Sequence, residues 1–203
     1  MSKLLLLTVA VLCVAGTACA GQNSGALAYL SWSPTSQVTD TAAGATNNLY
    51  VRFSRDAGLS FKGGEIDVTW DPPSNGAGCF DHLGTNYKTS SGTTCTYLNR
   101  GSTVPVVTDD SETHLHVAWA NNSTLTGCTS GAAIQIQYET DGCSDPTGCF
   151  SLNYASTLDG NNDVDVATII TSVVTVGGGG GHSCLQTPVA PSTWGGIKAL
   201  YKP

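Results

Sequence analysis

The stretch SRDAGLSFKGGEIDVTWDPP, residues 54–73, decides the fold class of this 203-residue chain. In its second half, apolar and polar residues alternate until two prolines end the pattern. One face of the expected strand carries Ile66, Val68 and Trp70, and the other carries Glu65, Asp67 and Thr69. Alternation with period two is typical of an antiparallel strand with one face on a core and the other in water. We therefore expect Trp70 in the core and Glu65 and Asp67 on a solvated face.

The same alternation recurs along the chain, and helix signals are nearly absent before the last ten residues. The further segments are LAYLSW (27–32), LYVRFS (49–54), THLHVAW (113–119), AIQIQY (133–138), FSLNY (150–154) and IITSVVTV (169–176). Gly, Ser, Thr, Asn and Asp dominate the gaps between them. This composition predicts an all-β chain in which two antiparallel sheets pack face to face as a sandwich. Trp119 lies on the apolar face of its segment and is expected in the core.

Residues 1–20 have the features of a secretory signal peptide. A positive charge at Lys3 precedes an apolar run that ends at Ala18-Cys19-Ala20. This run is shorter than the roughly 20 residues of a membrane-spanning helix. We expect cleavage after Ala20 and a secreted, extracellular or cell-surface protein without a transmembrane span. The alternative is a periplasmic or lipid-anchored protein that begins at Cys19, although Gly16 stands where a lipidation signal has a larger apolar residue.

The charge balance excludes some partners. Without Lys3 the chain has seven basic and 15 acidic residues, a net charge of −8. Phosphate backbones and anionic membrane surfaces attract basic proteins, so we expect no nucleic acid partner and no anionic membrane partner.

Six of the eight cysteines lie beyond the signal peptide: Cys79, Cys95, Cys128, Cys143, Cys149 and Cys184. An even number in an oxidising compartment predicts three disulfides. Zinc is the less favoured alternative, because the chain has no C-x-x-C pair. We expect Cys79–Cys95 to close a long loop and Cys143–Cys149 to close a short turn. The expected strand between Cys128 and Cys143 separates those two too far for a bond, which leaves Cys128–Cys184 as the default pair.

The chain divides into a β-sandwich domain (21–176), a glycine-rich linker (177–182) and a C-terminal tail (183–203). In the tail, Thr193 could cap a short helix from Trp194 to Tyr201. The tail is interpreted as a docking helix or, alternatively, as a sorting or attachment signal.

Two stretches, GEIDVTWDPP (64–73) and NYASTLDGNNDVDVATIITSVVTV (153–176), resemble those of cohesin domains in type and order. The resemblance covers about residues 26–176. It implies a jelly-roll sandwich of about nine strands, related to some carbohydrate-binding modules. Cohesins bind dockerin modules in polysaccharide-degrading assemblies, so the resemblance implies a binding module.

The first half of the opening stretch is similar to an Asp-box, a turn of sialidase-type propellers, with Ser54, Asp56, Gly58 and Phe61 at the characteristic positions. We expect a tight turn between two strands, forming a braced hairpin with Phe61 packed beneath it. A sialidase propeller has several such boxes and an arginine triad on a much longer chain. The expected role of this Asp-box-like turn is therefore structural.

Oxygen-bearing side chains recur at every second position of one loop, at Asp159, Asn161, Asp163 and Asp165. This spacing suits a structural calcium ion, although Val164 and Ile170 depart from the EF-hand pattern. The alternative is a polar turn. No cofactor is required for the expected fold.

His114 and His116 share one face of their segment, and a metal site could use them with His82 or Asp81. The alternative is that both are ordinary surface residues. Glu65 and Asp67 could in the same way act as a pair of acids on a glycoside, or they could simply belong to a solvated face. The chain has no G-x-S-x-G nucleophile motif.

These observations favour a non-catalytic binding or adhesion module over an enzyme. Sandwiches present function on loops, so we expect the contact surface at residues 81–100 and 141–148. The candidate ligand-binding residues are Asp81, His82, Tyr87, Tyr97 and Arg100. The expected partner is a polysaccharide or an extracellular protein. The alternatives are a structural subunit that assembles with its own copies in a surface layer or fibre, and a small polysaccharide-acting hydrolase.

Overall fold

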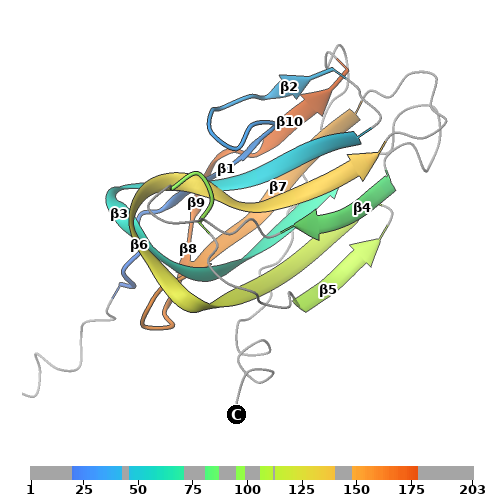
Figure 1. The fold of residues 1–203 in the computed structure, drawn as a ribbon. Coiled ribbons are helices and arrows are strands. Elements are labelled where there is room, and N and C mark those ends of the chain that lie inside the picture. The colour runs from blue at the N-terminus through green and yellow to red at the C-terminus, as the bar shows by residue number, and fades with distance from the viewer. Residues whose placement is uncertain are drawn as a thin grey trace, which may run out of the picture.

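A computed structural model describes residues 20–42, 46–70, 81–86, 95–98, 106–111, 113–139 and 148–177. In these ranges the chain is all-β, with ten strands and no helix (Figure 1). The strands are β1 (Leu27–Ser31), β2 (Asp40–Thr41), β3 (Thr46–Trp70), β4 (Asp81–Asn86), β5 (Val106–Ser111), β6 (His114–Glu139), β7 (Gly148–Leu158), β8 (Val164–Val166), β9 (Thr168–Thr171) and β10 (Val173–Val176). No helix in the described part of the chain could span a membrane. The predicted tail helix lies outside the described residues.

Two long strands, β3 and β6, connect the two layers of the sandwich. They run antiparallel from the pair Thr46–Glu139 to the pair Thr69–His114 and curl through both layers (Figure 1). One layer has the order β9-β1-β3-β6-β4, and the other has the order β5-β6-β3-β7-β10-β2. β8 pairs with the end of β7. The predicted two-layer sandwich is therefore confirmed. Its two layers belong to one continuous sheet, which folds over on itself where β3 and β6 bend.

The predicted hairpin at the Asp-box-like turn is wrong. The segments on either side of it do not pair with each other, since both belong to β3 and both pair with β6. Between Ser54 and Leu59 the register shifts, and Gly58 adopts a φ of 83° that favours glycine. Bulges bend a strand and increase its twist, so this irregularity carries β3 from one layer to the other. Phe61 is buried beneath the bend, as expected.

The core lies between the two layers and contains the apolar faces identified from alternation. Ile66, Val68, Trp70 and Trp119 are all buried, which confirms the inward assignment. Phe53 and Phe61 lie on either side of the bend in β3, with ring centroids 5.7 Å apart. Phe61 in turn lies 6.5 Å from the ring of Trp119 on β6. The aromatic contacts therefore run from one layer into the other.

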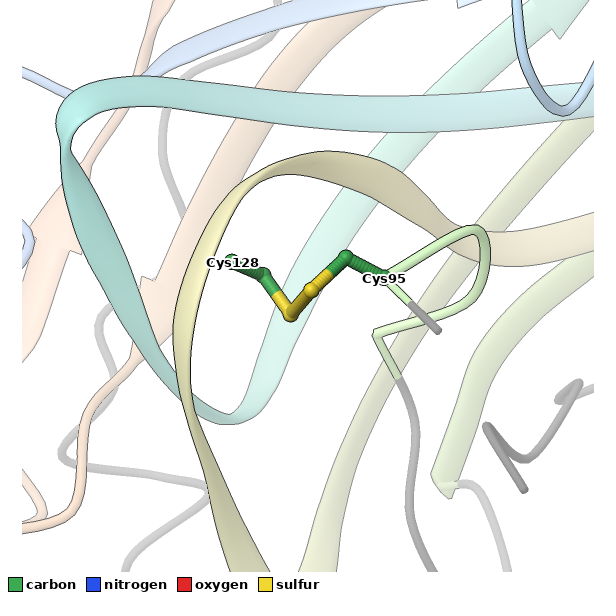
Figure 2. The surroundings of a disulfide bond; sticks show 2 residues. All are labelled: Cys95 and Cys128. Carbon is green, nitrogen blue, oxygen red and sulfur yellow. A yellow bond between two sulfur atoms is a disulfide. The ribbon is translucent and has the colours of Figure 1, made fainter. Parts of the chain in front are cut away.

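One disulfide in the described residues joins Cys95 to Cys128, with Cα atoms 5.4 Å apart (Figure 2). The predicted pairs Cys79–Cys95 and Cys128–Cys184 are therefore wrong. The prediction assumed that the long loop closes on itself. Instead, Tyr97 forms a parallel bridge with Ala132, which lays residues 95–98 alongside β6 and next to Cys128. Cys149 is also disulfide-bonded, but the predicted Cys143–Cys149 pair lies partly outside the described residues.

Candidate functional site

The outward face of the layer formed by β5, β6, β3 and β7 carries two carboxylates that are not solvated. Glu65 and Asp67 point away from Ile66 and Val68, as predicted, yet only 0% and 1% of their surfaces are exposed. The expected solvated face is therefore wrong at these two residues. Alternation identifies the face but not the side chains that neighbouring strands lay across it. Here histidines from β6 and an asparagine from β7 lie against the two acids.

Each histidine of β6 contacts one of the two acids. Nε2 of His116 lies 2.7 Å from Oε1 of Glu65, and Nε2 of His114 lies 2.7 Å from Oδ2 of Asp67. Nδ1 of His114 lies 2.8 Å from Oδ2 of Asp109 on β5. We call these five residues the histidine–carboxylate ladder. Its contacts cross three adjacent strands.

The ladder follows the diagonals of the strand register. His116 is directly opposite Asp67, and His114 is directly opposite Thr69. Each imidazole nevertheless contacts the acid that lies two residues earlier in β3 than the residue directly opposite. Diagonal neighbours on one face of a sheet are within reach of long side chains, and the twist of a bent strand pair brings them closer.

A bulge in β7 supplies a further partner for Asp67. The register shifts so that Asp67 opposes Tyr154 while Val68 opposes Leu152, which leaves Asn153 as the extra residue. Nδ2 of Asn153 donates hydrogen bonds of 3.0 Å to Oδ1 of Asp67 and to Oγ1 of Thr69. Both carboxylate oxygens of Asp67 are therefore held by neighbours, and its orientation is fixed.

The ladder favours a positive charge on His114. Burial lowers the pKa of this imidazole, but hydrogen bonds and negative charges from Asp67 and Asp109 outweigh burial and raise it above the ordinary 6.5. A protonated imidazole donates from both ring nitrogens, and each nitrogen of His114 faces a carboxylate oxygen. On the same face, the pKa of Tyr154 is raised, first by burial and then by the charge of Glu65, while the neighbouring Ser156 hydroxyl acts in the opposite direction.

The structure does not assemble the predicted histidine metal site. Asp81 and His82 pair with Glu139 and Tyr138 at the far end of β6, in the other layer from His114 and His116. The ring nitrogens that contact Glu65, Asp67 and Asp109 are already engaged. Within the described ranges, no group of three or more His, Cys, Asp or Glu side chains is arranged to hold a metal ion.

The other predicted ligand-binding residues are only partly described. Tyr97 is half-buried, and the pKa of Tyr50 is raised first by burial and then by Tyr97. The side chains of Asp81 and His82, and the whole of Tyr87 and Arg100, lie outside the described part. Ligand binding by these loops stays a prediction.

The acidic loop turns two of its carboxylates inward. Oδ1 of Asp159 accepts hydrogen bonds from the backbone N–H groups of Asn161 and Asp163, at 2.8 and 2.9 Å, and Oδ2 accepts one from Gln22 at 2.8 Å. Asp165 accepts one from the N–H of Asn23 at 2.9 Å. Asn161 and Asp163 are exposed. A calcium ion at this loop stays a prediction, to be tested by melting with calcium and with a chelator.

Sequence reasoning missed how these residues combine. It treated Glu65 and Asp67 as one candidate site and His114 and His116 as another, whereas the structure joins them. Asp109 and Asn153 were not identified. The alternation of residues 150–154 places Asn153 on the polar face of its segment, and this position could have identified it as a candidate. Asp109 had no comparable signal.

Solved structures of similar shape are cohesin modules. A cohesin module of a family 33 glycoside hydrolase from Clostridium perfringens has a TM-score of 0.53 and 8% identity, covering 76% of this chain and 96% of that one. A cohesin from Clostridium thermocellum, in the Coh-OlpA–Doc918 complex, has a TM-score of 0.52 and 8% identity, covering 76% and 99%. The sixth cohesin of scaffoldin B from Acetivibrio cellulolyticus, in complex with a mutant Cel5 dockerin, has a TM-score of 0.50 and 14% identity, covering 75% and 98%.

At these identities the likeness establishes the fold, and the chain is a cohesin-like β-sandwich. No protein-family model and no curated protein sequence matches it.

Proposed function

We propose that this chain is a non-catalytic protein-binding module that acts outside the cell and contacts its partner through the face carrying the histidine–carboxylate ladder. The observation that carries the proposal is the fold, because two of the similar structures are cohesins in complexes with dockerin modules. The Cys95–Cys128 disulfide supports an oxidising compartment. A dockerin-like protein is therefore the proposed class of partner.

The ladder suits a contact surface because it is ordered before a partner arrives. Three strands and a bulge hold its polar groups in place, so binding would cost little side-chain entropy. Its outer members remain accessible, since the side chain of His114 is 23% exposed and that of Asp109 is 49% exposed. A rigid polar surface of this kind provides specificity through the positions of its hydrogen bonds and charges.

The same geometry argues against the hydrolase alternative. A glycosidase needs two carboxyl groups that both reach the substrate. Glu65 and Asp67 are buried beneath their histidine and asparagine neighbours.

A polysaccharide partner is the second candidate. A flat sugar-binding platform needs exposed aromatic rings, and Trp70 and Trp119 are buried. Trp32 is half-buried, and its Nε1 donates a 2.8 Å hydrogen bond to the carbonyl of Thr175. Within the described residues, the large apolar side chains that are exposed are Val166 and Ile170, which are aliphatic. The burial of the described aromatic side chains therefore favours a protein partner over a polysaccharide partner.

Calorimetric titration of the oxidised chain from Gly21 tests the proposal, with dockerin modules and a glycan panel as ligands. Asp109→Arg reverses an exposed charge on the ladder, and Asp163→Arg is the matched control on the acidic loop. We expect a dockerin to bind the wild type and the control, and binding to fall at least about tenfold in Asp109→Arg. Binding of glycans alone would favour the second candidate. Loss of dockerin binding in the control alone would move the contact surface to the acidic loop.

A further inference from the structure

The first residues after the expected cleavage position form a bracket, residues 21–26, that joins three parts of the sandwich. The side chain of Asn23 is fully buried and clamps the bend of β3. Its Nδ2 donates to the carbonyl of Ser60 at 2.9 Å, and its Oδ1 accepts from the N–H of Ser60 at 2.8 Å. Nε of Arg55 donates to the carbonyl of Ser24 at 2.9 Å, and the N–H of Thr168 donates to Ala26 at 2.9 Å. The bracket is thus part of the folded domain.

The acidic loop holds the start of this bracket through two buried carboxylates. Asp159 accepts from the N–H of Gln22, and Asp165, which is 9% exposed, accepts from the N–H of Asn23. The residue just before the bracket, Ala20, is exposed.

Gly21 packs directly against the carboxylate of Asp165. A methyl carbon added to Gly21 would lie 2.8 Å from Cγ and 2.9 Å from Oδ1 of Asp165, so a side chain at this position would require the Asp165 carboxylate to move. The nitrogen and the Cβ position of one residue are about 2.5 Å apart, so the Gly21 nitrogen lies within about 5.3 Å of that Cγ. A small rotation of a terminal residue closes such a gap to an ion pair.

We propose that the α-ammonium group of Gly21, released by cleavage after Ala20, pairs with the carboxylate of Asp165 and completes this corner of the sandwich. Hydrolysis of the Ala20–Gly21 bond consumes one water and leaves a carboxylate on Ala20 and an amine on Gly21, which takes up a proton. A partly buried carboxylate gains most from such a pair, since it is poorly solvated. In the uncut chain the same nitrogen is a neutral amide. Processing at this bond therefore stabilises the fold.

This inference stands apart from the proposed binding function, and it separates the two processing routes. A chain that begins at a lipidated Cys19 keeps Ala20 and an uncharged amide at Gly21. A chain cut after Ala20 instead carries the positive charge of the Gly21 α-ammonium group next to Asp165.

Melting of chains with defined N-termini tests the pair. One chain begins at Gly21, a second begins at Ala20, and each is made with Asp165, with Asp165→Asn and with the control Asp163→Asn. We expect the Gly21 chain to melt about 2–4 °C above the Ala20 chain at neutral pH. The difference should persist in Asp163→Asn and vanish in Asp165→Asn. Equal melting of the two wild-type chains, or a difference that survives Asp165→Asn, would overturn the proposal.

Two further measurements keep the test independent of any folding defect in Asp165→Asn. Acetylation of the Gly21 amine leaves Asp165 intact and should lower the melting temperature to that of the Ala20 chain. NMR titration of the Gly21 amine should give a pKa above the ordinary value of about 7.7–8.0. An ordinary pKa together with no effect of acetylation would contradict the ion pair.

Discussion

The imidazole of His114 lies between the carboxylates of Asp67 and Asp109, and at this residue we expect stability to depend on pH. Burial lowers its pKa, but the two acids raise it further, so the net pKa in the folded chain lies above 6.5. A group whose pKa is raised on folding stabilises the folded state fully below its unfolded pKa. That contribution is lost as pH rises through the folded pKa. The free energy of unfolding should therefore fall across this window.

Urea denaturation between about pH 5 and about pH 9, compared between wild type and His114→Gln, measures this contribution. In the variant, the free energy of unfolding should fall less steeply with rising pH, because the contribution of His114 is missing. NMR titration should place the pKa of His114 lower in Asp109→Asn than in the wild type. Asp163→Asn, an exposed acid on another loop, is the control. Identical slopes in wild type and His114→Gln would show that the ladder does not set the pH dependence.

Among the elements, the bridge between residues 95–98 and β6 depends on the Cys95–Cys128 disulfide. The bond spans 33 residues of chain, and closing a loop of that size stabilises the folded state by about 3–4 kcal/mol in the chain-entropy model. We expect the double variant Cys95→Ala, Cys128→Ala to lose about that much, measured by denaturant unfolding without reductant. Reductant should then affect the variant less than the wild type. A loss below about 1 kcal/mol would mean that the bridge holds without its bond.

The close approach of β3 to β6 depends on Gly63. A Cβ atom there would overlap the carbonyl oxygen of Trp119 and lie 2.8 Å from Cα of Ala120, and neither is a flexible side chain. Gly63→Ala should therefore destabilise the chain by about 3 kcal/mol or more. Gly127, with a φ of 81° and open space around it, is the matched control, and Gly127→Ala should cost only about 1–2 kcal/mol. Equal losses in urea unfolding would refute the steric argument.

These elements also show how far sequence could predict the molecule. Alternation identified the strand segments and the buried faces of Trp70 and Trp119, because period two reports which side chains share a face. It could not reveal that residues 49–54 and 65–70 belong to one strand, because a bulge keeps the chain extended where the Asp-box pattern predicts a turn. The ladder was out of reach for a related reason. It depends on which strands are neighbours, and pairing between distant segments leaves no local pattern.

At the scale of the whole molecule, β3 and β6 each belong to both layers, so the layers should unfold together. Phe53 and Phe61 lie on either side of the bend in β3, and Trp119 continues their contacts onto β6. Phe53→Ala should lower the free energy of unfolding by about 3–5 kcal/mol. Ile170→Ala, at a side chain 55% exposed, should change it by no more than about 0.5 kcal/mol.

The shared strands also determine how the Phe53→Ala variant should unfold. In a chain whose other two tryptophans, Trp32 and Trp194, are replaced by phenylalanine, tryptophan fluorescence reports on the environment of Trp70 and Trp119, and amide exchange along β1 reports on the other layer. A cavity at Phe53 weakens contacts on both sides of the bend. The unfolding transitions that the two probes report should therefore shift to lower denaturant concentration by the same amount and stay coincident. Separate transitions would mean that the bend in β3 is a hinge between two units that fold independently.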